Sequence, residues 1–404
     1  MRELNRRGLT SAIDAGGGLQ NYPDDYKVIE KLEAEGQLTI RIAYNLFTQK
    51  PKGELDDFKK WTSTSKYGSG SDFLRHNGAG EMLVFSAADF EDFLEPRPEL
   101  PDSMEKELED VVRILVSNRW PFRLHATYDE SISRMLDVFE SVNREIPFDG
   151  LPWFFDHAET INQRKQDMLS AMTVGTDIQD GMAFHDVYLV QRERGDATKQ
   201  PTHIRRMLCA RLPVVDGTDA TRVSRFNHWY TLYWLVSTKT VDGLPLYSEG
   251  LSRELALELY THGSAWFSSE QGKKGMIKEG QFADFIALSA DYFTIDEEKI
   301  KQIESVLTVV NGKVVYATEE FGKLAPSELS VMPDWSPVRK FPGHFNPRGY
   351  ATGIAGKEQA VTAHHCCGAC SVHGHNHDVA RKADIPTDDY RDFWGAFGCS
   401  CFVF

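Results

Sequence analysis

Two histidines and one aspartate stand at the ends of three short apolar runs. His125 closes the run FRLH, His157 closes WFFDH, and Asp219 follows PVVDGT. In a parallel α/β barrel, functional side chains lie at the carboxyl ends of the strands. Imidazole suits zinc, and a carboxylate can bind a metal or act as a base. This set predicts a site for a divalent metal, with zinc as the expected ion, that would activate a water molecule.

A single histidine at a strand end is more often a hydrogen-bonded structural residue than a ligand, so only the ordered set of three points to a metal. Other residues are candidates for substrate binding. His185 and His203 could line the pocket, and Arg222, close after Asp219, could hold a substrate carboxylate through two hydrogen bonds.

A second group of ligand types lies near the C-terminus. Cys367 and Cys370 have the C-x-x-C spacing of zinc ligands, and a His-x-His-x-His run follows them. The members of this tail cluster are Cys366, Cys367, Cys370, His373, His375 and His377. The tail cluster is a candidate second metal site. The alternatives are a reactive tail with an incidental density of such residues, and a redox role.

Short apolar runs alternate with helical patterns over the first two-thirds of the chain. The expected strands are Thr10–Ala15, Thr39–Leu46, Phe122–Thr127, Trp153–His157, Ala171–Thr176 and Pro213–Thr218, with a weaker one in Lys66–Asn77. Met104–Val116 and Ile132–Val142 carry apolar residues at helical spacing. Such alternation predicts βαβ units and a parallel sheet, either a barrel or a large doubly wound sheet. We interpret Asp56–Asp102 as an irregular insertion or lid.

The pattern changes after about residue 225. Leu251–His262 is expected to form a helix with Ser252 as N-cap and Gly263 as its stop. Short β runs follow, and Asn311-Gly312 is a strong signal for a two-residue hairpin. A small β element therefore follows the α/β part, and periodicity is lost beyond residue 322.

These motifs resemble those of a known family. His125 in LHATYDE, His157 in FDHAETI and Asp219 in DGTDATRV look like the motifs of strands five, six and eight in the amidohydrolase superfamily. The closer likeness is to its YtcJ-like, amidohydrolase-3 group. This resemblance implies that His125 and His157 ligate one metal. Asp219 would ligate metal and activate the water that attacks a polarised carbonyl.

Two further features concern the same resemblance. The run Gly275-x-x-x-x-Gly280-x-x-Ala283-Asp284 resembles the element that closes the β-sandwich of those enzymes. The family's His-x-His of strand one does not occur before the tail, and Thr10–Ala15 matches strand two. The resemblance thus implies an α/β fold, a TIM-like (β/α)8 barrel lacking its first strand, with part of a small β-sandwich. For the family's bridging Lys or Glu of strand four, Lys66 and Glu81 flank the motif but neither aligns convincingly.

Composition limits the classes of partner. The net charge of −15 argues against nucleic acid and against an anionic membrane surface. There is no apolar run long enough for a transmembrane helix, and the first residues lack the apolar core of a signal peptide. Five of the six cysteines lie after residue 365, which fits a reducing cytoplasm better than a disulfide-stapled secreted protein. A small-molecule substrate is the expected partner.

The leading hypothesis is a metal-dependent hydrolase of a non-peptide C–N bond in an amide, cyclic amide or formamide. The alternatives are a catalytically impaired fragment or pseudoenzyme that needs an N-terminal segment, and a metal-binding module acting through the tail cluster. A barrel without one strand has two open edges, which a homo-oligomer or a separately encoded segment could cover. The expected domains are 1–250 (incomplete barrel), 251–322 (helix and sandwich part) and 323–404 (irregular extension).

Overall fold

The computed structural model describes residues 1–16, 21–89, 99–158, 161–171, 174–179, 203–220, 226–240, 243, 245 and 247–327. These residues all belong to the first of two compact units, Met1–Ser327 and Glu328–Phe404. The tail cluster, His185 and Arg222 lie outside the described residues. No helix among the described residues has both the length and the apolar character needed to cross a membrane. The three domain boundaries expected from the sequence stay predictions.

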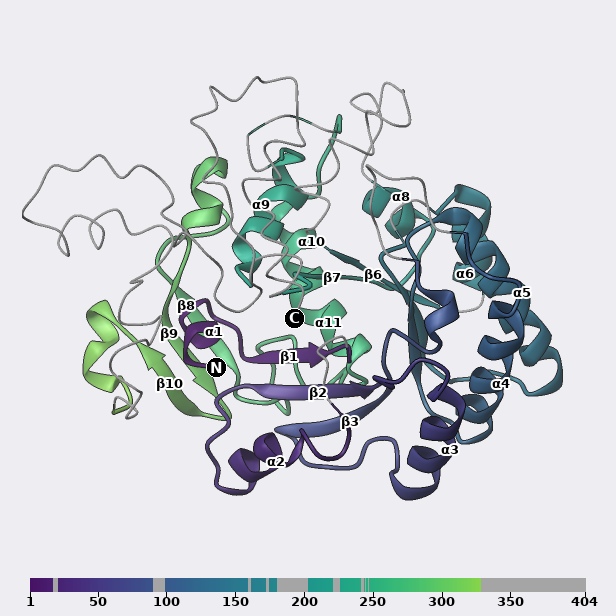
Figure 1. The fold of residues 1–404 in the computed structure, drawn as a ribbon. Helices are drawn as coiled ribbons and strands as arrows, with labels where there is room; N and C mark the ends of the chain where they lie inside the picture. The colour runs from purple at the N-terminus through teal and green to yellow at the C-terminus, as the bar shows by residue number, and fades with distance from the viewer. Residues whose placement is uncertain are drawn as a thin grey trace, which may run out of the picture. The chain divides into compact units, whose positions relative to one another are not determined.

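Seven parallel strands form the main sheet, and their order in space is their order in the chain (Figure 1). The strands are β1 (Ser11–Asp14), β2 (Arg41–Leu46), β3 (Leu74–Ala79), β4 (Phe122–His125), β5 (Trp153–Asp156), β6 (Gly175–Gln179) and β7 (Val214–Gly217). Each expected strand is present, although β6 begins four residues later than expected from the apolar run. Strands that pair with their sequence neighbours through helical crossovers are the arrangement of a (β/α) barrel, here with seven strands.

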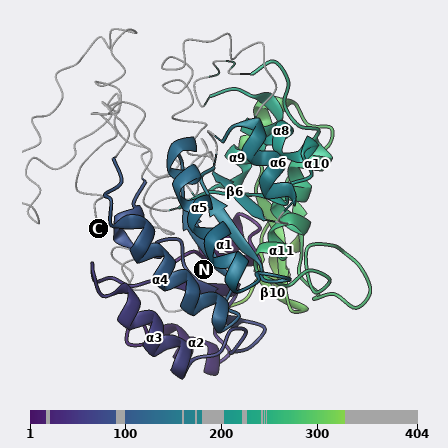
Figure 2. The same ribbon diagram turned by 90° about the vertical axis from the view of Figure 1, so that its right-hand side faces the viewer.

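Helices cover the outer face of this sheet. They are α2 (Lys27–Ala34), α3 (Glu54–Thr64), α4 (Met104–Ser117), α5 (Asp129–Glu145), α6 (Gln163–Ala171), α8 (His203–Cys209) and α9 (His228–Ser237), whereas α1 (Arg2–Arg6) packs against the smaller antiparallel sheet. Figure 2 shows α3 beside α4 and α4 beside α5. In α4, Leu108, Val112 and Leu115 are fully buried because their spacing places them on one face of the helix. Both helices expected here, in α4 and α5, are confirmed.

The interior of the sheet is filled by side chains from distant strands. Phe154 of β5, Val215 of β7 and Phe267 form one buried cluster, and Ile13 of β1 packs against it. The first and last strands of the sheet therefore contribute to one core, which requires the sheet to curl around its own interior. This is the packing of a barrel rather than of a flat, doubly wound sheet.

The expectation that Asp56–Asp102 is irregular is wrong for nearly half of its described residues. This segment contains nearly all of α3, which buries Phe58 and Trp61, and the whole of β3. Strand β3 is hard to recognise because its inner residues are polar. The buried His76 ring is hydrogen-bonded to the carbonyl oxygens of Lys66 and Gly78, at 3.1 Å each.

The helix expected over Leu251–His262 begins as predicted but does not stop at Gly263. Ser252 caps α10 (Arg253–Glu258) by accepting a hydrogen bond from Leu255 N at 3.2 Å. A π-helical turn, η3 (Leu259–Gly263), then leads into α11 (Ser264–Phe267). A Cβ at Gly263 would lie 3.1 Å from the carbonyl oxygen of Val214 in β7. This glycine thus allows a close approach between helix and strand, rather than ending the helix.

A second sheet has three antiparallel strands in the order β10-β9-β8. They are β8 (Phe285–Leu288), β9 (Ser305–Val310) and β10 (Lys313–Ala317), and short 3-10 helices lie at Phe85–Ala87, Glu297–Gln302 and Glu319–Leu324. The expected hairpin is confirmed, because Asn311 and Gly312 both have positive φ, as a type I′ turn requires. Helix α1 packs against β9 and β10.

One buried ion pair joins the two sheets. The Arg41 guanidinium of β2 donates two hydrogen bonds to the Asp284 carboxylate, at 2.6 and 3.0 Å. The same guanidinium lies over the rings of Phe73 and Phe282. Asp284 also accepts a hydrogen bond from Asn311 N in the hairpin turn. The aspartate that ends the Gly275–Asp284 run therefore anchors the small sheet to the barrel.

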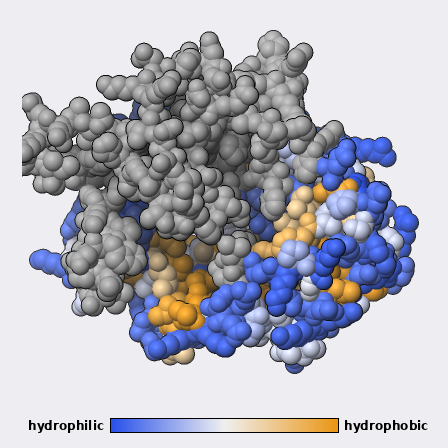
Figure 3. All heavy atoms as spheres, in the orientation of Figure 1, coloured by the Kyte–Doolittle hydropathy of each residue, from blue (hydrophilic) through white to orange (hydrophobic). Residues whose placement is uncertain are grey.

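The described surface is mostly hydrophilic on the face seen in Figure 3, with hydrophobic residues in smaller separate areas. This distribution agrees with helices that bury one face and present charged residues on the other.

Candidate metal centre

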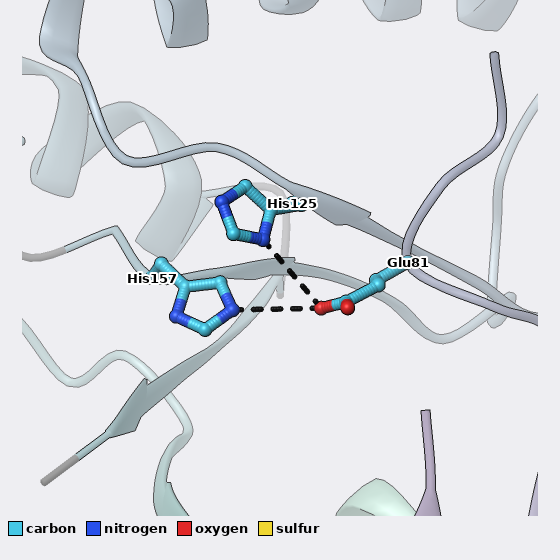
Figure 4. A group of neighbouring side chains, drawn as sticks. All are labelled: Glu81, His125 and His157. Atoms are coloured by element: carbon cyan, nitrogen blue, oxygen red, sulfur yellow. Dashed lines mark ion pairs between the residues drawn. The ribbon is translucent and has the colours of Figure 1, made fainter. Parts of the chain in front are cut away.

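Three side chains from the carboxyl ends of neighbouring strands converge (Figure 4). His125 is the last residue of β4, His157 follows β5 directly, and Glu81 lies two residues beyond β3. Both histidines are buried, with 4% and 6% of their surface exposed. Because β3, β4 and β5 are adjacent and parallel, their ends meet at one edge of the sheet.

Backbone hydrogen bonds fix Glu81 in this position. Its N–H donates to the carbonyl oxygen of Ala15 after β1, and its carbonyl accepts from His125 N, both at 3.0 Å. The preceding Gly80 allows this close approach, since a Cβ there would lie 2.5 Å from the Ala15 carbonyl oxygen. His157 has a φ of 65°, an uncommon conformation for a residue other than glycine.

The distances suit a single metal ion. Glu81 Oε2 lies 3.7 Å from His125 Nδ1 and 3.5 Å from His157 Nε2. One ligand atom from each of the three residues lies within 4.8 Å of the others, and no further group of this kind occurs among the described residues. Tetrahedral zinc with bonds of about 2.0–2.1 Å places its ligand atoms about 3.4 Å apart. Two imidazoles and one carboxylate are also a donor set that zinc accepts.

The charge around the site also favours a cation. Burial opposes ionisation of Glu81, but the two imidazoles outweigh it and lower the pKa of this carboxyl well below its usual range. Asp156 and Asp177 lie beside the same cluster with Arg123 between them. Burial raises the pKa of Asp177 to about 7, against the opposing effect of Arg123. The three carboxyl groups of Glu81, Asp156 and Asp177 therefore lie near a single guanidinium, and a divalent ion would offset the negative charge of those that are ionised.

The structure describes only some of the other site residues that the sequence predicts. Asp219 follows β7, is exposed and has a φ of 46°, and it does not belong to the close group of three. Its role as ligand and base stays a prediction. His203 begins helix α8, but its side chain is not among those described. The substrate-binding roles of His185, His203 and Arg222, and the tail cluster, likewise stay predictions.

Glu81 is the residue that the sequence reasoning missed. In the sequence this glutamate does not align convincingly with the bridging ligand of strand four, yet its carboxylate lies within 3.7 Å of a ring nitrogen of each histidine. Its strand was masked by the polar run LRHNGA. The available signal was an acidic residue a few positions after the weak candidate strand in Lys66–Asn77, near the strand end, where His157 also lies relative to its own strand.

Comparison with known proteins places the chain in a family. The model of the Amidohydrolase family named Amidohydro_3 matches residues 1–316. Putative amidohydrolase YtcJ of Bacillus subtilis (strain 168) is 27% identical over 198 residues, which are 48% of this chain and 37% of that protein. The chain thus matches little more than a third of this curated relative's length.

Solved structures share the fold. A metal-dependent hydrolase from Pyrococcus horikoshii OT3 is 20% identical with a TM-score of 0.53, covering 71% of this chain and 57% of that one. A mutant of atrazine chlorohydrolase TrzN from Arthrobacter aurescens TC1, complexed with zinc and atraton, is 14% identical with a TM-score of 0.54, covering 81% and 73%. The sequence motifs, the family match and the fold agree: this chain belongs to the amidohydrolase family, in its amidohydrolase-3 group.

Proposed function

We propose that the protein is a metal-dependent hydrolase that cleaves a C–N bond other than a peptide bond. The convergence of Glu81, His125 and His157 at the carboxyl ends of adjacent strands carries this proposal. Names of similar proteins support it, since they include a metal-dependent hydrolase, a triazine hydrolase and a zinc complex of atrazine chlorohydrolase. The expected substrates are amides, cyclic amides or formamides.

Each residue has a separate task in this proposal. Glu81, His125 and His157 would hold a divalent ion, with zinc expected. When bound, the ion would polarise the substrate carbonyl and lower the pKa of a water molecule towards about 7. Asp219, exposed at the end of β7, would take the proton from that water and pass it to the leaving nitrogen.

A panel of small amides, cyclic amides and formamides tests this proposal, with the purified full chain assayed before and after chelation. We expect hydrolysis of at least one class, its loss on chelation and its return with added Zn²⁺. His157→Ala should abolish the metal-dependent rate, whereas His262→Ala, on the helix turn η3, should leave it unchanged. Stoichiometric metal binding without hydrolysis of any member would instead favour the catalytically impaired alternative.

A further inference from the structure

A buried guanidinium lies directly beneath the candidate metal centre. Arg123 is two residues before His125 on β4, so both side chains point to the same face of the strand. Arg123 is only 3% exposed. Its Nε and Nη2 donate to the two carboxylate oxygens of Asp156, at 2.6 and 2.8 Å, and Nη2 also donates to Asp177 Oδ2 at 2.7 Å. These hydrogen bonds therefore join the neighbouring strands β4, β5 and β6 near their carboxyl ends.

The group formed by Arg123, Asp156 and Asp177 is directly connected to both histidines. The sheet register places His125, Asp156 and Asp177 opposite one another on β4, β5 and β6. His157 follows Asp156 in the chain, and its backbone N–H donates to the Asp177 carbonyl at 3.0 Å. The end of β5 is thus held from both neighbouring strands. On one side the Asp156 side chain accepts hydrogen bonds from Arg123 of β4, and on the other the His157 backbone N–H donates to Asp177 of β6.

His157 needs such support because of its backbone conformation. A φ of 65° costs free energy for a residue with a Cβ and persists only where the surroundings impose it. The pairing of Arg123 with Asp156 has the planar, two-bond geometry that specifies orientation as well as attraction. A point charge such as lysine would satisfy the charge of Asp156 without fixing its plane.

We propose that Arg123 is a positioning residue: its paired hydrogen bonds to Asp156 hold the end of β5 so that His157 Nε2 stays in place to bind the metal. The inference rests on the proposed metal-dependent function and assigns Arg123 no contact with the metal or the substrate. Partners that orient metal ligands commonly change metal affinity by about 10–100-fold when removed.

Arg123→Lys tests this assignment, because it keeps the charge and removes the paired geometry. The matched control is Arg41→Lys, which breaks another buried two-bond pair, Arg41 with Asp284, at the opposite end of the sheet. Metal-free full-length variants would be titrated with Co²⁺, following affinity and the visible spectrum that reports ligand geometry. We expect about 10–100-fold weaker binding and an altered spectrum for Arg123→Lys, and near wild-type values for Arg41→Lys.

A second pair of variants covers the case in which Arg123→Lys does not fold. Asp156→Asn and Asp177→Asn each replace one carboxyl group that faces Arg123 by an amide, but only the first disrupts the two-bond pair with Arg123. Asp156→Asn should weaken Co²⁺ binding by at least tenfold more than Asp177→Asn. Wild-type affinity and spectrum in Arg123→Lys, or equal losses in the two asparagine variants, would overturn the inference alone. A wild-type chain that binds no Co²⁺ would overturn the proposed function as well.

Discussion

At the scale of single residues, the sequence predicts two of the three converging side chains. His125 and His157 are recognisable because each closes a short apolar run, and the structure brings them together with ring centroids 4.1 Å apart. Glu81 could not be singled out in the same way. Its strand buries polar residues such as His76 and Asn77, so the run before it lacks the apolar signature of a strand.

Asp219 provides the first prediction at this scale. Because it lies outside the group of three ligands, Asp219→Asn should lower kcat by about 10²–10⁴-fold, as expected for loss of a general base. One equivalent of bound metal should remain, measured by elemental analysis after dialysis. If Asp219→Asn loses the bound metal as well as the activity, Asp219 is a ligand that is required for metal binding.

His228 provides a prediction on pH. Burial, with a smaller contribution from Arg7, lowers the pKa of His228 to about 3 in the folded chain, against 6.5 when unfolded. Between these values only the unfolded state binds the proton, so stability falls as the pH drops below about 6.5. From pH 7 to pH 5 this group should cost about 2 kcal/mol of the free energy of unfolding.

Urea denaturation of wild type and His228→Gln at both pH values measures this effect. The variant lacks the titrating group, so its stability relative to wild type should improve by about 2 kcal/mol on going to pH 5. An unchanged difference between the two proteins at pH 7 and pH 5 would mean that His228 does not titrate in this way.

At the scale of elements, patterns with strong periodicity were predictable and local exceptions were not. The α4 and α5 helices and the Asn311-Gly312 hairpin follow directly from spacing and turn chemistry. The continuation of the helix past Gly263 could not be predicted, because the reason for that glycine is the nearby carbonyl of Val214, which lies 49 positions earlier in the chain. Tertiary contact overrides the usual role of glycine as a helix stop.

The link between the two sheets provides a prediction at this scale. Arg41→Met leaves the buried Asp284 carboxylate without its partner, so the free energy of unfolding should fall by about 3–5 kcal/mol. Arg134 forms a similar two-bond pair with Glu105 at a partly exposed position, and Arg134→Met should cost no more than about 1 kcal/mol. Equal losses in the two variants, measured by denaturant unfolding, would show that the Arg41 pair does not anchor the small sheet.

At the scale of the whole molecule, the seven-stranded parallel sheet and the separate antiparallel sheet were predictable from the order of the motifs. The choice between a barrel and an open sheet was not predictable from periodicity, because both have the same alternation of strands and helices. The resemblance carried by three ordered motifs and the glycine-rich run was decisive, and the family match over residues 1–316 confirms it.

The tail cluster supplies a prediction for the whole chain. The described residues hold one group with metal-ligand geometry, in the barrel. Replacing Cys366, Cys367, Cys370, His373, His375 and His377 together by alanine in the full-length protein should leave one equivalent of tightly bound metal and the hydrolytic rate unchanged. Loss of all metal from that variant would favour the alternative in which the tail cluster is the metal-binding module.

The central claim is that one divalent ion is held by Glu81, His125 and His157. Anomalous diffraction at the zinc edge, on crystals of the zinc-loaded protein, tests it most directly. We expect one strong peak about 2.0–2.2 Å from Glu81 Oε2, His125 Nδ1 and His157 Nε2, and no peak there in His157→Ala. A zinc-loaded crystal whose anomalous peaks all lie away from these three atoms would contradict the account.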